Sequence, residues 1–177
     1  MHIRMPKPGD GKAVYSAVQA SINEWKPWLP FAQQEQSEVD VEKNSREAHC
    51  KFLKREDLRL LGFHKGSNQF IVSAGLHRID WHVRKFKIGY WVDSRYAGKG
   101  YVTEAFDAIE KFAFEQLHAN RIEIRCDAKN IKSRAVAEQL DYLLEGILRN
   151  DDYSVDRKEL RDTCVYSKLR LLLEFNV

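Results

Sequence analysis

The chain has 177 residues, which is enough to form a substantial hydrophobic core without help from disulfides or metal ions. Its 29 basic and 26 acidic side chains are spread along the sequence, so the formal net charge of +3 does not indicate a nucleic-acid-binding surface. The three cysteines, Cys50, Cys126 and Cys164, lie far apart and lack the spacing of a zinc site. We therefore expect a single domain over residues 1–177, with reduced thiols and no metal.

The amino-terminal residues Met1 to Pro6 contain no apolar core of the kind found in a signal peptide. No apolar stretch approaches the length of a membrane span. These features predict a cytoplasmic protein with neither a membrane nor a nucleic acid as its partner.

The first third of the chain is predicted to be mostly helical. A short strand over 2–5 is followed by an amphipathic helix, whose apolar residues between 13 and 22 share one face. Two prolines then interrupt regular structure in the aromatic segment 25–31. The highly charged segment 37–56 is typical of a second helix that is exposed to solvent.

The middle of the chain changes to the spacing of strands. Residues 58–64, 69–79 and 86–92 read as three strands joined by short turns, which indicates an antiparallel meander. Apolar residues at helical spacing then predict a long helix over 102–117. A clear alternation over 121–126 predicts a strand that points Ile122, Ile124 and Cys126 inward and Arg121, Glu123 and Arg125 toward solvent.

The last third is predicted to contain a short helix around 135–140 and two closing strands, 143–148 and 163–169. A polar hairpin, 149–161, is expected to join these strands. The whole order predicts a mixed α/β domain in which about four helices flank a mostly antiparallel, twisted sheet of about seven strands.

The segment from Lys87 to Ala105 combines an apolar strand, a turn with Gly98 and Gly100, and the start of the long helix. A helix that begins after glycines presents unpaired backbone N–H groups and the positive end of its dipole, and together these attract phosphate. A P-loop is excluded because no Gly-Lys-Ser/Thr is present, and a Rossmann motif because the third glycine is missing. The segment therefore predicts a phosphate-binding turn of another kind.

The spacing Arg95-x-x-Gly98-x-Gly100 resembles the pyrophosphate signature of the GCN5-related N-acetyltransferases, the GNAT family. Further segments are similar to its RimJ/RimL-like branch, which acetylates the amino termini of ribosomal proteins. These segments are Ile88–Val92, Gly98–Ala105, Asn120–Cys126, Asn130–Glu138, Leu144–Arg149 and Val165–Ser167.

The resemblance implies that acetyl-CoA is the acetyl donor and that eleven residues bind it. In this reading the strand around Trp91 splays away from its neighbour and exposes backbone for the pantetheine arm. The implied cofactor-binding residues are Trp91, Val92, Arg95, Ala97, Gly98, Lys99, Gly100, Tyr101, Val102, Asn130 and Ser133. For Asn130 and Ser133, simple capping of the following helix remains an alternative.

Catalysis needs a route for two protons, one from the amine and one to the departing thiolate. The resemblance implies Ser133 as the proton donor to sulfur, with water as the alternative. It also implies Asp152 as the base, next to Asp151 in the predicted hairpin; Glu145 and bulk water are the alternatives.

The resemblance also implies that Trp28, Leu29 and Phe31 form a wall of the acceptor site, although a role in the core is equally open. We expect direct attack by an amine in a ternary complex. A protein α-amine, with a pKa of about 7.7 to 8.0, suits a weak base better than a lysine does. A small amine such as a polyamine or an amino sugar is an alternative acceptor, and the carboxylates of 37–56 keep the polyamine option open. An alternative function is that of a non-catalytic acyl-CoA-binding sensor. Whether the protein forms a homodimer is left open.

Overall fold

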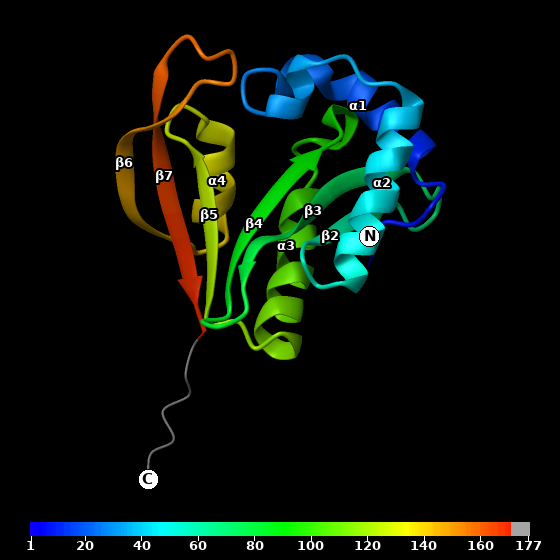
Figure 1. Cartoon of the computed structure of the whole chain (residues 1–177). Coiled ribbons are helices and arrows are strands. Elements are labelled where there is room, and N and C mark those ends of the chain that lie inside the picture. Colours follow the sequence, from blue (N-terminus) through cyan, green and yellow to red (C-terminus); the bar gives the residue numbers. More distant parts are fainter. Residues whose placement is uncertain (171–177) are drawn as a thin grey trace.

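The computed structural model describes residues 1–170, which form a seven-stranded sheet in the order β1-β2-β3-β4-β5-β7-β6 (Figure 1). All neighbouring strands are antiparallel except β4 and β5, which run parallel. The strands are β1 (His2–Arg4), β2 (Leu58–Phe63), β3 (Phe70–Asp80), β4 (Lys85–Val92), β5 (Arg121–Asp127), β6 (Leu143–Tyr153) and β7 (Leu160–Leu169). The predicted mixed α/β class and the mostly antiparallel sheet are confirmed.

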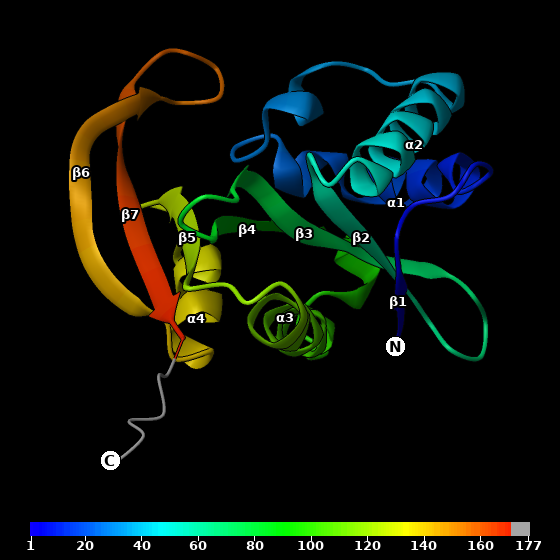
Figure 2. The ribbon, with the colours of Figure 1, turned by 60° about the horizontal axis from the view of Figure 1, so that its bottom comes forward.

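Four α-helices flank the sheet: α1 (Gly11–Trp25), α2 (Glu38–Leu53), α3 (Tyr101–Lys111) and α4 (Ile131–Gln139). Figure 2 shows α1 and α2 on one face of the β1–β4 half, with α3 on the opposite face and α4 beside β5 on the same side as α3. The other face of the β5–β7–β6 half carries no helix (Figure 2). No helix within residues 1–170 is long and apolar enough to cross a membrane.

Two apolar clusters hold these layers together, one on each face of the sheet. On the α3 side, Phe86 and Ile88 of β4 are buried, and Tyr90 and Val92 pack against the same cluster. The next residue in the alternation, Trp91, faces α1 and stacks on Trp25, with ring centroids 4.7 Å apart. Since successive residues of a strand point to opposite faces, β4 contributes to both clusters.

The sheet is split in its middle, because β4 and β5 pair only through Lys85–Lys87 and Arg121–Glu123. Beyond Lys87, β4 remains paired with β3, and β5 remains paired with β7. Figure 1 shows the upper parts of β4 and β5 diverging. The backbone edges that face this split, over 88–92 and 124–127, therefore lack each other as hydrogen-bonding partners. The splay that the resemblance implied is present in the fold.

Three local predictions were wrong. The polar hairpin is shorter than expected, because β6 continues to Tyr153 and β7 begins at Leu160, so Asp152 lies within a strand. The predicted helix 102–117 changes to π-helix over Phe112–Gln116. Glu123 lies on the predicted face of β5 but is not open to solvent: Arg121, Arg125 and Lys87 surround its carboxylate, and the residue is only 5 % exposed.

Candidate active site

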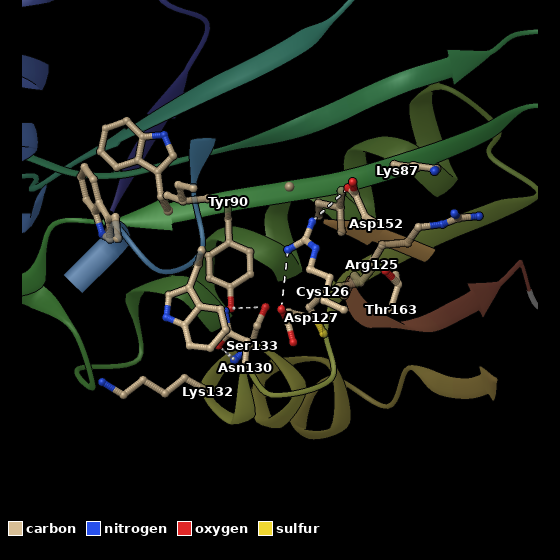
Figure 3. Close-up of a pocket in the computed structure, with 18 of the residues that line it drawn as sticks. Lys87, Tyr90, Arg125, Cys126, Asp127, Asn130, Lys132, Ser133, Asp152 and Thr163 are labelled. Atoms are coloured by element: carbon tan, nitrogen blue, oxygen red, sulfur yellow. Dashed lines mark hydrogen bonds and ion pairs between the residues drawn. The ribbon is translucent and has the colours of Figure 1, made fainter. Parts of the chain in front are cut away.

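A pocket of about 480 Å³ lies in the split between β4 and β5 (Figure 3). Its walls come from both strands, the first turn of α4, the β6–β7 hairpin and the loop that follows α1. Tyr90 and Cys126 approach it from the face that α3 and α4 cover, since both pack against the apolar cluster there. Lys87, Arg125 and Asp127 lie on the opposite face of the sheet, because they alternate with buried Phe86, Ile88, Ile124 and with Cys126; this face carries no helix over β5 (Figure 2). The pocket thus connects the two faces of the sheet.

The wall on the α4 side carries hydroxyl, amide and thiol groups. The Tyr90 hydroxyl donates to Oγ of Ser133 at 3.4 Å, a long contact for two hydroxyls. Oδ1 of Asn130 accepts from the backbone N–H of Ser133 at 3.1 Å, so Asn130 caps α4 while its amide NH2 stays free for another acceptor. Burial raises the pKa of Tyr90 and raises that of Cys126 to about 11, so both groups are protonated at neutral pH.

The opposite wall carries carboxylates, two of which lie near Arg161. Asp127, Asp151 and Asp152 line this part of the pocket with Arg161. Nη2 of Arg161 lies 3.2 Å from Oδ2 of Asp152, and Nη1 lies 3.8 Å from Oδ2 of Asp127. The backbone N–H of Tyr153 and the Arg161 guanidinium lower the pKa of Asp152. Asp152 is therefore ionised at neutral pH and can attract an ammonium group.

The aromatic segment after α1 divides between the pocket and the core. Trp28 and Leu29 line the pocket. Phe31 does not: its ring lies edge-on to Trp25, with centroids 5.9 Å apart, and 6.1 Å from Trp91, within the cluster under α1. Trp91 and Val92 of β4 also line the pocket.

The glycine turn lies outside the pocket and is open to solvent. Gly98 and Gly100 have φ angles of 72° and 78°, a region that favours glycine, and a Cβ added at either would meet no atom within 4 Å. No side chain caps the start of α3 after Gly100. Glycine at these two positions therefore allows the positive φ angles of the turn. It also leaves open space beside the unpaired N–H groups at the start of α3, as phosphate binding requires.

The charged groups of this turn are bound within it. The Arg95 guanidinium donates to both oxygens of Asp93, a fully buried carboxylate that also accepts the Arg95 backbone N–H. Nζ of Lys99 donates to the Arg95 carbonyl at 3.0 Å. Ala97 is exposed, whereas Tyr101 and Val102 pack partly against the core. Asp93 thus fixes the turn's conformation and partly neutralises Arg95.

Glu145 lies away from the pocket. Its carboxylate receives two hydrogen bonds from Arg121, at 2.5 and 2.6 Å, and one from Ser167 at 2.6 Å. These contacts lower the pKa of Glu145 to about 2. Such a carboxylate is a weak base and is already fully engaged, so Glu145 is not placed to accept a proton from an amine in the pocket.

The structure adds pocket residues that the sequence pattern did not single out. Tyr90 was assigned only to an apolar strand face, and nothing in its alternation shows that a split exposes its hydroxyl. The other added residues that carry charge or a hydroxyl are Arg78, Lys87, Arg125, Asp127, Lys132, Arg161 and Thr163. These residues share a position near the β4–β5 split, and this position cannot be known until the strand pairing is known.

A glycine turn with the features of a phosphate site, joined through a split sheet to a pocket that carries carboxylates and cations, is suited to transferring a group from a phosphate-bearing donor to an amine. The sequence matches the acetyltransferase (GNAT) domain family over residues 1–142. YdaF of Bacillus subtilis, which carries the name of a ribosomal N-acetyltransferase, is 31% identical over 154 residues, covering 85% of this chain and 82% of its own.

Solved structures share the fold. RimL, a ribosomal L7/L12 α-N-protein acetyltransferase in complex with coenzyme A, superposes with a TM-score of 0.87 at 20% identity, covering 95% of this chain and 93% of its own. MccE, a microcin C7 self-immunity acetyltransferase in complex with acetyl-CoA and AMP, gives a TM-score of 0.85 at 21% identity, over 94% and 91% of the two chains. The chain belongs to the GNAT acetyltransferase family and is an acetyl-CoA-dependent N-acetyltransferase.

Proposed function

We propose that this enzyme transfers the acetyl group of acetyl-CoA to the N-terminal α-amine of a protein, by direct attack within a ternary complex. The observation that carries the proposal is the pocket in the β4–β5 split, which has Ser133 and Tyr90 on one wall and Asp152 on the other. Ribosomal proteins are the favoured class of acceptor, because the name of the relative YdaF points to them.

The donor is proposed to lie along the split, with its diphosphate over Gly98 and Gly100 and its pantetheine against the free edge of β4. The pantetheine amides would form hydrogen bonds with the backbone around Trp91 and Val92. The side-chain NH2 of Asn130 is free to donate a further hydrogen bond to the arm. Donors placed where charge develops on the thioester oxygen stabilise the transition state. A thioester held in this way lies beside Ser133.

In the chemical step the neutral amine forms a bond with the carbonyl carbon, and the carbon–sulfur bond breaks. Asp152 attracts the ammonium form and receives the amine proton through a water molecule. Its lowered pKa makes it a poor base for direct abstraction. Ser133, to which the Tyr90 hydroxyl donates, gives a proton to the thiolate, and its oxygen regains a proton through water from the one that the amine released. The acetylated amine and free coenzyme A are the products.

An α-amine fits this weak base better than other amines. At pH 7 about a tenth of α-amines are neutral, against a far smaller fraction of lysine side chains with a pKa of about 10.4. A polyamine acceptor is less well supported, because the carboxylates of α2 do not line the pocket. Glu42 is occupied by the backbone of Gly9 and Gly11, and Asp40 closes the helix cap with Ser37.

The test is release of coenzyme A thiol when the enzyme is given acetyl-CoA and amines of different classes. The panel contains short peptides with free amino termini, the same peptides with blocked amino termini and a free lysine, and spermidine. We expect release above the hydrolysis background only with free α-amines. Faster turnover with spermidine or with the lysine of blocked peptides would overturn the proposed acceptor.

A further inference from the structure

The end of the pocket beyond Asp152 is lined by three cations, Arg78, Lys87 and Arg125. In Figure 3, Asp152 lies between Tyr90 on one side and Lys87 with Arg125 on the other. Lys87 pairs with Glu123 at the point where β4 and β5 separate, and Arg125 lies two residues after Glu123. In β3, Lys87 pairs with His77, and Arg78 is the next residue. The three cations therefore come from adjacent strands and gather at the base of the split.

Within residues 1–170, the carboxylates that form ion pairs at this end are fewer than the cations. Glu123 is shared by Arg125 at 2.6 Å, Arg121 at 3.0 Å and Lys87 at 3.5 Å. The only other carboxylate in this network is Glu145, which binds Arg121. Arg78 forms no ion pair with any residue of 1–170, and its side chain is exposed. These ion pairs join three cations to two carboxylates, and Arg78 adds a fourth positive charge, which also acts on Asp152 at the border with the other end of the pocket.

The electrostatics of Lys87 reflect this excess. Burial is the main cause that lowers its pKa, and the charge of Arg125 lowers it further, as does that of Arg78, against the opposing effect of Glu123. An anion bound at this end would stabilise the charged form of Lys87. The environment therefore favours a negatively charged group on a ligand.

The other end of the same pocket has the opposite imbalance. Arg161 lies 3.8 Å from Asp127 and 3.2 Å from Asp152, and Asp151 lines the same pocket. A ligand that matches both ends carries an ammonium group near Asp152 and a negative charge toward Lys87 and Arg78. A polyamine would place its second cation at the wrong end, where like charges repel.

We propose that the acceptor is a peptide amino terminus with one or more carboxylates in the residues that follow the acetylated one, and that Arg78, Lys87 and Arg125 bind these carboxylates. This inference rests on the proposed function, because it assumes that the acceptor amine lies near Asp152. It adds a selectivity for acidic amino-terminal sequences that α-amine acetylation alone does not require.

The test compares peptides that differ only in charge after the first two residues: Ser-Ile-Asp-Glu-Ala, its neutral isostere Ser-Ile-Asn-Gln-Ala, and Ser-Ile-Lys-Lys-Ala. We expect kcat/KM for the acidic peptide to exceed that of the neutral one about tenfold at low salt, and to lose most of this advantage at high salt, because the contacts are partly exposed. Equal values for the two peptides at low salt would overturn the inference.

Two arginine variants locate the effect. Arg78 and Arg84 both lie in the β3–β4 region, both are exposed, and both have positive φ angles, 46° and 53°. Only Arg78 lines the pocket. We expect R78Q to lower kcat/KM about fivefold more for the acidic peptide than for the neutral one, while R84Q changes neither. Equal losses for both peptides in R78Q would contradict the assignment.

A binding measurement separates this inference from the proposed function. N-acetylated forms of the acidic and neutral peptides are titrated into the enzyme–coenzyme A complex, which requires no turnover. If no peptide is acetylated, the proposed function fails; tighter binding of the acetylated acidic peptide, weakened by R78Q, would still support the basic end as an anion site. Equal binding of both products would overturn the inference even if both free peptides were acetylated.

Discussion

The hydroxyl of Tyr90 donates to Oγ of Ser133, so a residue in the middle of β4 contacts the first turn of α4 across the split in the sheet. Tyr90 itself is held by packing, since its ring lies edge-on to Phe106 of α3 with centroids 5.1 Å apart. The contact links the helix that covers one half of the sheet to the strand that ends the other half.

The first prediction concerns this pair. Because a Ser133 hydroxyl that loses its donor is a poorer and less well oriented acid, Tyr90→Phe should lower kcat about tenfold and leave the affinity for acetyl-CoA nearly unchanged. Ser133→Ala should lower kcat by a similar or larger factor. If the two residues act in one proton path, the double variant should be no slower than Ser133→Ala. Steady-state kinetics test this.

A matched control for Tyr90 is Tyr15→Phe, which removes a hydroxyl from α1 outside the pocket. We expect its kcat to equal that of the unmodified enzyme. If the fold-loss of kcat in the double variant equals the product of the two single losses, Tyr90 and Ser133 act independently, which contradicts the shared path.

The second prediction concerns the glycine turn. Gly98→Ala and Gly98→Asp both place a side chain at a positive φ, so each should cost about 1 kcal/mol of stability. Only the aspartate adds negative charge beside the expected diphosphate. Isothermal titration with acetyl-CoA should therefore give a modest loss of affinity for the alanine variant and a loss of at least about 100-fold for the aspartate variant.

Gly146→Ala serves as the comparison, because this glycine also has open space around its Cβ position but has no positive φ and lies in β6. It should leave acetyl-CoA binding unchanged. Similar affinities for the two Gly98 variants would mean that the diphosphate binds elsewhere.

The third prediction is a pH profile. The backbone N–H of Tyr153 and the guanidinium of Arg161 lower the pKa of Asp152, so this carboxylate is ionised throughout the neutral range. With a peptide acceptor, kcat/KM should rise tenfold per pH unit and level off near the α-amine pKa of about 8. Asp152→Asn should reduce the plateau about tenfold without moving it, with little change in acetyl-CoA affinity.

Asp156→Asn provides the control, because Asp156 lies in the exposed β6–β7 turn and not in the pocket. It should behave as the unmodified enzyme does. A plateau that shifts with Asp152→Asn would indicate direct proton transfer to Asp152, and unchanged turnover would assign the proton to another group or to water.

The fourth prediction concerns stability. Burial raises the pKa of Glu123, but hydrogen bonds from Arg121 and Arg125 and the charges around it lower it more, so the net pKa is below its usual value near 4.5. Glu123→Gln leaves those cations without their shared carboxylate, and should reduce the free energy of unfolding by about 3 kcal/mol at pH 7. Urea denaturation measures this difference.

The pH dependence of that difference follows from the direction of the shift. A carboxylate with a lowered folded-state pKa stabilises the protein above its unfolded pKa and loses this effect as pH falls through the folded value. The gap between the two proteins should thus narrow below about pH 4.5. Glu159→Gln, which breaks an exposed pair with Lys129, should change stability by at most about 0.5 kcal/mol. A Glu123 variant as stable as this control would show that the buried network contributes little.

Much of the fold could be predicted because its apolar periodicities are strong. The alternation of Phe86, Ile88, Tyr90 and Val92 predicts which face of β4 is buried, and the structure agrees. The end of β6 could not be found in this way: from Arg149 to Tyr153 the strand is exposed and polar, so its pairing with β7 leaves no apolar pattern.

Glu123 shows a second limit of sequence reasoning. In an isolated strand its alternation with Ile122 and Ile124 indicates a solvent-facing residue. Its nearer cations, Arg121 and Arg125, lie on its own strand, whereas Lys87 reaches it only through the pairing of β4 with β5. The packing that buries Glu123 depends on strand pairing, which local periodicity does not encode. The basic end of the pocket was missed for the same reason.

The brief pairing of β4 with β5 has a consequence for the empty enzyme. Only three residues of each strand join the two halves of the sheet. Along the rest of the seam, the backbone N–H and C=O groups of β4 and β5 do not pair with each other. If the pantetheine arm binds along that seam, as proposed, its amides bond to the free backbone edges and connect the two halves of the sheet. The unliganded protein should accordingly exchange amide hydrogens fastest along this seam, and occupancy by coenzyme A should slow that exchange before any acceptor arrives.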